Sequence, residues 1–129
     1  MFDIENLLEL KEDKKLEFKK AHGGLPKSLW ETYSAFANTD GGIILLGIEE
    51  FSSDKISVTG IENPENLIKQ FWNEINNRQK TSSNILTDRN VEIINYKNKI
   101  IIKISVPRAD RHEKPVYVNN DLFISNFFI

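Results

Sequence analysis

Residues 38–50 constrain the fold of this chain more than any other segment. They open with NTDGG, which predicts a tight turn, because glycine adopts positive φ at low cost and short polar side chains bond to neighbouring backbone groups. Such a turn could also present N–H groups to an anion, but the order of helix then strand reverses that of a P-loop, so a tight connection is favoured. The sequence IILLGI at 43–48 is almost wholly apolar and predicts a central strand buried on both faces. Glu49 and Glu50 are predicted to end this strand.

Two longer helices are predicted from apolar residues that recur with a period near 3.6. The first follows Pro26 and should end near Asn38, and the second starts at Asn63 and Pro64, a capping residue followed by a first-turn proline. A shorter amphipathic helix is predicted over residues 3–11. The apolar stripes of the longer helices should pack on a sheet rather than stack on nucleobases. They comprise Leu29, Trp30, Tyr33, Phe36 and Ala37 in the first helix, and Leu67, Ile68, Phe71, Trp72 and Ile75 in the second.

Strands are predicted before and after these helices. Residues 16–19 alternate apolar and charged side chains, as a half-buried strand does. Residues 91–96 and 100–106 are rich in β-branched side chains and flank a short polar turn, which predicts a hairpin. Residues 115–125 predict a second, weaker hairpin. The order of elements predicts an α+β fold in which two long helices and a short N-terminal helix pack on a mixed β-sheet.

Length and composition limit the class of protein. The 129 residues, 40% of them hydrophobic, suit a single domain over 1–129. The sequence has no cysteine and two histidines, which excludes a disulfide framework, a thiolate zinc site and a histidine-rich metal site. No apolar run approaches the roughly 20 residues that a membrane span requires, and the acidic start does not resemble a signal peptide. We therefore expect a cytoplasmic protein with no membrane partner.

Three segments resemble one known family in their residue types and order. They are EDKKLEFK at 12–19, SAFANTDGGIILLGIEE at 34–50, and ISVPRADRHEKPVY at 104–117. Together they resemble the schlafen/AlbA-like domain, which is found at the N-terminus of many bacterial transcriptional regulators and inside the animal schlafen proteins. The resemblance implies an α+β domain associated with DNA binding and joined to downstream domains in a longer polypeptide.

The same resemblance implies a site made of acidic side chains. In the schlafen branch, related domains form a metal-dependent ribonuclease centre from three carboxylates, and the matching positions here are Glu12, Glu17 and Glu50, with Glu49 as the substitute for the third. Converging carboxylates repel one another unless a hard cation such as Mg²⁺ or Mn²⁺ neutralises them. Considered without the resemblance, these residues are better interpreted as solvated acids that pair with Lys14, Lys15 and Lys19; the resemblance makes the metal site an equal alternative.

Basic side chains gather in two segments. They are Lys14, Lys15, Lys19 and Lys20 around the first strand, and Arg108, Arg111, His112 and Lys114 in the loop that precedes Pro115. Lysine and arginine bind phosphates and release counterions in doing so. If the two segments share a surface, they form a basic groove wall despite the formal net charge of −2; otherwise they are solvated charges.

Three functions remain open from the sequence. The preferred one is a nucleic-acid-binding module of a transcriptional-regulator-like protein, with DNA or structured RNA as the partner and the basic residues as the binding surface. The second is an endoribonuclease that acts on structured RNA through the three carboxylates with Mg²⁺ or Mn²⁺; no other cofactor is expected. The third is a structural or dimerisation domain, which would suit the negative net charge, the apolar C-terminal residues and a homodimer.

Overall fold

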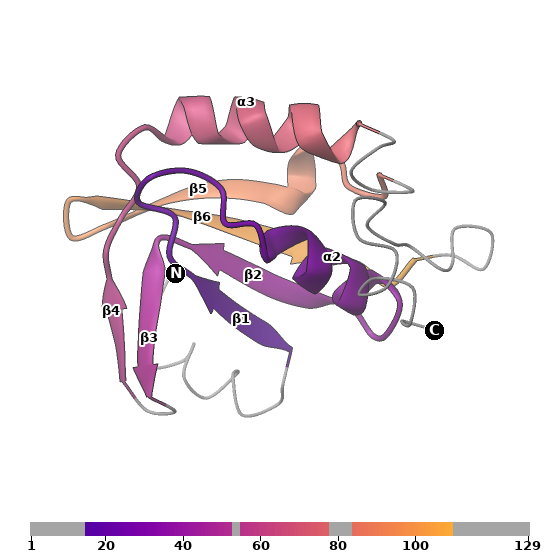
Figure 1. Cartoon of the computed structure of the whole chain (residues 1–129), viewed down its shortest axis with the longest axis horizontal. Helices are drawn as coiled ribbons and strands as arrows, with labels where there is room; N and C mark the ends of the chain where they lie inside the picture. The colour runs from indigo at the N-terminus through magenta and orange to yellow at the C-terminus, as the bar shows by residue number, and fades with distance from the viewer. Residues whose placement is uncertain (1–14, 53–54, 78–83, 110–129) are drawn as a thin grey trace.

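The computed structural model describes residues 15–52, 55–77 and 84–109 (Figure 1). The predicted helix at 3–11 and the predicted hairpin at 115–125 lie outside these ranges. In chain order the elements are β1 (Leu16–Lys19), α2 (Leu29–Ala37), β2 (Gly42–Leu46), β3 (Ile48–Ser52), β4 (Lys55–Val58), α3 (Pro64–Ile75), the 3₁₀ turn η1 (Asp88–Asn90), β5 (Val91–Tyr96) and β6 (Lys99–Val106).

A four-stranded sheet organises the fold, with the strand order β1-β2-β6-β5. β1 and β2 are parallel, whereas β6 is antiparallel to both of its neighbours. Consecutive β5 and β6 are joined by a two-residue turn at Lys97 and Asn98, which both have positive φ. The predicted hairpin is therefore confirmed, and so is the α+β class with a mixed sheet.

Both long helices form where the sequence predicts them. α2 ends at Ala37 with Asn38 as its C-cap. α3 begins at Pro64, and the Asn63 side-chain oxygen accepts a hydrogen bond from the Asn66 amide at 3.2 Å, which satisfies one of the free donors of the first turn. Neither helix in the described residues is long and apolar enough to cross a membrane.

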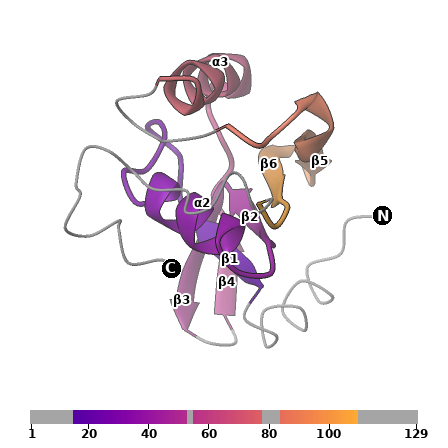
Figure 2. The ribbon, with the colours of Figure 1, turned by 90° about the vertical axis from the view of Figure 1, so that its right-hand side faces the viewer.

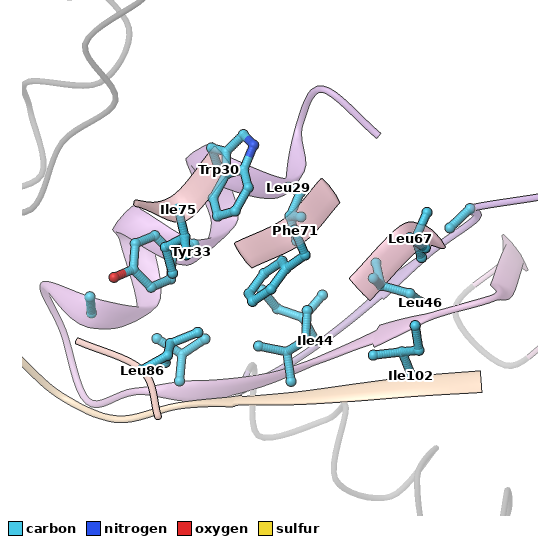
Figure 3. Close-up of a cluster of buried hydrophobic side chains, with 14 of the residues drawn as sticks. Leu29, Trp30, Tyr33, Ile44, Leu46, Leu67, Phe71, Ile75, Leu86 and Ile102 are labelled. Atoms are coloured by element: carbon cyan, nitrogen blue, oxygen red, sulfur yellow. The ribbon is translucent and has the colours of Figure 1, made fainter. Parts of the chain in front are cut away.

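The main core lies between the two helices and one face of the sheet (Figure 3). The rings of Trp30 on α2 and Phe71 on α3 stack with their centroids 5.3 Å apart. The Trp30 indole also donates to Glu74 at 2.9 Å, and the Tyr33 hydroxyl accepts from the Ile85 amide at 3.1 Å. These aromatic side chains are buried in the core, which confirms that the helical stripes pack on the sheet.

The predicted strand at 43–48 is wrong in its extent. β2 stops at Leu46, and Gly47, with φ of +100°, turns the chain into a separate two-stranded sheet of β3 and β4. The Gly47 carbonyl accepts hydrogen bonds from the amides of Thr59 and Gly60, both at 2.9 Å, so the return from β4 meets the same corner. This second sheet covers part of the sheet face opposite the helices. A second buried cluster forms there from Leu16, Phe18, Leu45, Ile48 and Ile101.

Candidate nucleic-acid interface

One end of the four-stranded sheet brings together two of the predicted basic residues. β1 and β2 begin at this end and β6 finishes there, because β6 runs opposite to the other two strands. The Ile43 amide donates to the Lys15 carbonyl at 2.8 Å, which fixes Lys15 at the start of β1. Arg108 follows Val106, the last residue of β6, whose partner is Gly42. Two strand spacings, roughly 10 Å, separate the β1 and β6 backbones, and both Lys15 and Arg108 are exposed.

Backbone packing holds Arg108 in place from both sides. The Ala109 amide donates to the Ala37 carbonyl at the end of α2, at 2.8 Å. Gly41 has φ of +86°, and a Cβ at this position would lie 2.6 Å from the Val106 carbonyl oxygen and 3.2 Å from the Arg108 amide nitrogen. Glycine is thus required for this approach, and the tight connection predicted for the NTDGG segment is confirmed.

A third cation at this end, Arg89, is not singled out by the sequence. It is exposed in η1, immediately before β5, and the neighbouring Asn90 side chain donates to the Ser105 carbonyl on β6 at 2.9 Å. Arg89 stands alone in a polar loop, so only the pairing of β5 with β6 places it on the same side as Arg108. The exposed acids Asp40 and Asp88 lie in the adjoining turns and reduce the positive charge of this end.

Lys19 and Lys20 lie at the other end of β1. A strand of four residues spans about 13 Å, so these lysines do not share the end that carries Lys15. The Lys19 ammonium donates to the Ser28 hydroxyl at 2.9 Å, just before α2. The Lys20 ammonium lies 3.8 Å from a Glu49 carboxylate oxygen; both side chains are partly exposed, so this ion pair contributes little stability. The basic residues around β1 are therefore divided between two ends of the sheet.

Of the predicted acidic residues, Glu17 lies in the four-stranded sheet, and Glu49 and Glu50 lie in the two-stranded sheet. Glu17 is half-buried in the middle of β1, next to Ile44 of β2 and on the helix-covered face. Glu50 is exposed within β3, opposite Ile56, and not at the end of a strand that neighbours β1, because Gly47 ends β2 before it. In the parts of the chain that the structure describes, no three histidine, aspartate or glutamate side chains are placed to hold a metal ion.

Five of the predicted site residues fall outside the described ranges. They are Glu12 of the acidic set, and Lys14, Arg111, His112 and Lys114 of the basic set. The three-carboxylate metal site therefore stays a prediction, and so does the contribution of the loop that follows Arg108.

A cleft of about 190 Å³ opens at the opposite end of the sheet, where the sequence assigned no function. It lies between the His22–Gly24 loop after β1 and the start of α3. Side-chain amides and Glu62 dominate its polar lining, and a negative carboxylate disfavours a phosphate there. The lining residues are Ala21, His22, Gly23, Gly24, Ile61, Glu62, Asn63, Asn66, Leu67 and Gln70. This cleft is therefore separate from the basic end described above.

The chain belongs to the Schlafen, AlbA_2 family, whose model matches residues 12–129. This match confirms the resemblance seen in the three sequence segments. None of the curated proteins gives a match.

Two solved structures share the fold. The first is the solution NMR structure of the N-terminal domain of a RecG-related protein of Nitrosomonas europaea, described as related to an ATP-dependent DNA helicase; it is 23% identical, with a TM-score of 0.71 over 92% of this chain and 81% of that one. The second is the crystal structure of the DIP2311 protein of Corynebacterium diphtheriae, which is 18% identical with a TM-score of 0.58. This second match covers 92% of the present chain and 23% of that protein.

Proposed function

We propose that the chain is a nucleic-acid-binding domain of a transcriptional-regulator-like protein and that the end of the sheet carrying Lys15 and Arg108 contacts the phosphates. The observation that carries the proposal is that these two cations, ninety-three positions apart in the sequence, are exposed on either side of the start of β2. Membership of the Schlafen, AlbA_2 family supports the same function. The RecG-related protein that shares the fold is described as related to a DNA helicase, which is also consistent with it.

The charge distribution sets the expected mode of binding. The chain as a whole has a formal net charge of −2, so a polyanion is repelled by most of the surface and must be attracted locally. Phosphate contacts from a few exposed cations give binding that is weak, sensitive to salt and largely independent of base sequence. Single strands, duplex DNA and folded RNA should therefore be compared at several salt concentrations before sequence preference is tested.

Replacing Arg108 by alanine should weaken binding to labelled nucleic acid about five- to tenfold, because each phosphate contact releases roughly one counterion. The slope of log affinity against log salt concentration should fall by about one for the same reason. Fluorescence anisotropy with duplex DNA and with an RNA hairpin, measured across a potassium chloride series, gives both quantities. The matched control is Lys69→Ala, which removes the same charge from an exposed position on α3.

Equal losses in Arg108→Ala and Lys69→Ala would mean that overall charge, and not this end of the sheet, governs binding. An affinity of the unaltered chain that does not change with salt would contradict phosphate recognition altogether.

A metal-dependent endoribonuclease is the second candidate, and the position of Glu17 favours it. The Glu17 carboxylate is half-buried on the helix-covered face of β1, opposite the face that buries Leu16 and Phe18, and a solvated acid is more often fully exposed. Oxygen ligands of this kind are the ones that Mg²⁺ and Mn²⁺ prefer, and an ion held by Glu12, Glu17 and Glu50 would polarise a phosphodiester and activate water. This proposal requires residues 12 and 50 to approach Glu17.

Millimolar Mn²⁺ should raise the melting temperature by about 4 °C if the carboxylates bind it, because a ligand that binds only the folded state stabilises that state. Glu17→Ala should abolish the shift, whereas Glu92→Ala, an exposed acid on β5, should retain it. Differential scanning calorimetry measures the shift, and labelled transfer RNA incubated with the same variants reports cleavage. If Mn²⁺ does not change the melting temperature of the unaltered chain, the carboxylates do not bind the ion and the ribonuclease proposal is wrong.

A further inference from the structure

Among the residues that the structure describes, β5 forms an edge of the four-stranded sheet, and its own sequence lacks the features that usually protect such an edge. Figure 2 shows it at the margin of the sheet, away from α2, with β6 as its neighbour. Exposed edges are commonly blocked by proline, lysine, a bulge or a short strand, since unpaired backbone groups bind other strands. β5 has six residues, VEIINY, whose register with β6 is unbroken, and Glu92 is its only charged side chain.

The apolar side chain most exposed on the four-stranded sheet lies on this strand. Ile93 is 50% exposed, although its cross-strand partner Ile102 is 1% exposed. Phe51, at 65%, is the other large apolar side chain that is exposed in the described residues, and it lies on the separate sheet. Leaving an isoleucine half-exposed costs part of the free energy that its burial would supply.

The hairpin turn shows which backbone groups of β5 point outward. Lys97 and Asn98 both have positive φ, as in a type I′ turn, whose flanking residues exchange hydrogen bonds. Bonded and non-bonded pairs alternate along an antiparallel ladder, so residues 96, 94 and 92 bond to β6. The N–H and C=O groups of Val91, Ile93 and Asn95 therefore point away from β6, toward the side of β5 on which no described strand lies.

The pairing of β1 with β2, at the opposite edge of the sheet, leads independently to the same assignment of outward-facing groups on β5. The amides of Ile43 and Gly47 donate to β1 carbonyls, both at 2.8 Å, so the alternate β2 residues 44 and 46 face β6. Their partners on β6, residues 104 and 102, therefore direct their backbone groups toward β2. The alternate β6 residues 103, 101 and 99 direct theirs toward β5, where their partners are residues 92, 94 and 96. Ile93 thus combines a half-exposed apolar side chain with outward backbone groups.

The geometry points to a second copy of this chain as the partner of this edge, with the two β5 strands antiparallel about a two-fold axis at Ile93. In that register Ile93 faces Ile93 of the other copy, Val91 faces Asn95, and Glu92 faces Ile94. About six backbone hydrogen bonds join the copies, two for each outward-facing pair. The two four-stranded sheets become one continuous sheet across the dimer.

The sequence of β5 is complementary to itself in this register. No two like charges are opposed, because the single Glu92 meets an isoleucine. The two Ile93 side chains cover each other on one face, and the two Ile94 side chains become diagonal neighbours on the other. A two-fold axis at Val91 or at Asn95 would shorten the paired segment. An axis at Glu92 would place the two Glu92 carboxylates opposite each other, and the backbone groups of the central pair would point toward β6 and could not bond to the other copy. Identical strands that satisfy each other in this way favour an isologous dimer over an unrelated partner.

Cysteine cross-linking tests both the partner and the register, since the chain has no cysteine of its own. Cα atoms in a hydrogen-bonded antiparallel pair lie about 5.5 Å apart, which a disulfide can span. Ile93→Cys, incubated with oxidised glutathione as the electron acceptor, should give mostly disulfide-linked dimer. Asn95→Cys should stay near background, because the two thiols would be displaced by four residues, roughly 13 Å along the strand. Mixing Val91→Cys with Asn95→Cys should restore the cross-link between the two variants.

Equal cross-linking of Ile93→Cys and Asn95→Cys would reveal random collision and overturn the proposal. Sedimentation equilibrium supplies a second measurement without new thiols: the unaltered chain should dimerise as its concentration rises from micromolar to millimolar. Ile93→Lys should remain monomeric, and Phe51→Lys, which alters a more exposed apolar residue on the separate sheet, should still dimerise. A monomer at every concentration, or a dimer that survives Ile93→Lys, contradicts pairing through β5.

Discussion

Phe71→Ala is expected to lower the free energy of unfolding by about 4 kcal/mol, the largest loss for any single side chain considered. Phe71 is 3% exposed, its ring stacks on Trp30 at 5.3 Å between centroids, and it meets Trp72 edge to face at 5.2 Å. Removing the ring leaves a cavity between α2, α3 and the sheet, and it also breaks both aromatic contacts. Urea unfolding followed by tryptophan fluorescence measures the loss directly, because both tryptophans touch Phe71.

The expected fall in melting temperature is roughly 12 °C, since a domain of this size loses a few degrees for each kcal/mol. Phe51→Ala is the matched control, because it also replaces a phenylalanine by alanine. The Phe51 side chain is 65% exposed on β3, so its removal should change the free energy of unfolding by less than about 0.5 kcal/mol. If the two variants unfold at the same urea concentration, the helices do not pack on the sheet as described.

Gly41→Ala is expected to cost about 3 kcal/mol, even though it adds only one methyl group. The new Cβ would lie 2.6 Å from the Val106 carbonyl oxygen, and the backbone would keep φ near +86°, which L-residues other than glycine adopt at a cost. Relief requires the turn before β2 to move away from the end of β6. Because Arg108 follows that end, the variant should also bind nucleic acid less well if the proposed interface is correct.

Gly23→Ala provides the comparison for this effect, since an added Cβ there meets no atom within 4 Å. It should unfold within about 0.5 kcal/mol of the unaltered chain. Thermal unfolding by circular dichroism compares the two variants. A Gly41→Ala chain as stable as Gly23→Ala would show that the turn relaxes freely and does not hold Arg108.

The parts of the fold that the sequence predicted are those in which local chemistry and tertiary packing agree. Asn63 followed by Pro64 specifies a helix start by itself, and the structure shows the expected bond from the Asn66 amide. The hairpin is likewise specified by two β-branched runs and by Lys97 and Asn98 between them, where asparagine tolerates a left-handed backbone.

The second sheet was missed because its first residue continues an apolar run. Ile48 looks like one more position of the strand before it, and a lone glycine within a strand is compatible with either a bend or an uninterrupted strand. One feature of the sequence does indicate this corner. Gly47 and Gly60 lie on either side of a segment that contains the short strand-like run 55–58, as expected for a hairpin that leaves and rejoins the main sheet at two glycines. Periodicity alone cannot separate one long strand from two short ones that meet at a corner.

The candidate site was predicted less well than the fold because a cluster in sequence is not a cluster in space. Lys15, Lys19 and Lys20 are close along the chain, but an extended strand moves forward by about 3.3 Å per residue and carries them to opposite ends. Arg89 and Arg108, nineteen positions apart, lie on the same side because a hairpin folds the chain back between them. Pairing between strands, which single residues do not reveal, decides which charges are neighbours.

Gly47 has a consequence for how this fold can vary between relatives. Its carbonyl receives the amides of Thr59 and Gly60, so residues 48–58 leave the main sheet and come back at a single peptide group. A segment whose two ends are joined in this way can be lengthened, shortened or exchanged while the rest of the backbone keeps its path, because closing a longer loop costs little additional entropy. The β3–β4 hairpin is accordingly the natural position at which this scaffold could accept a grafted recognition element.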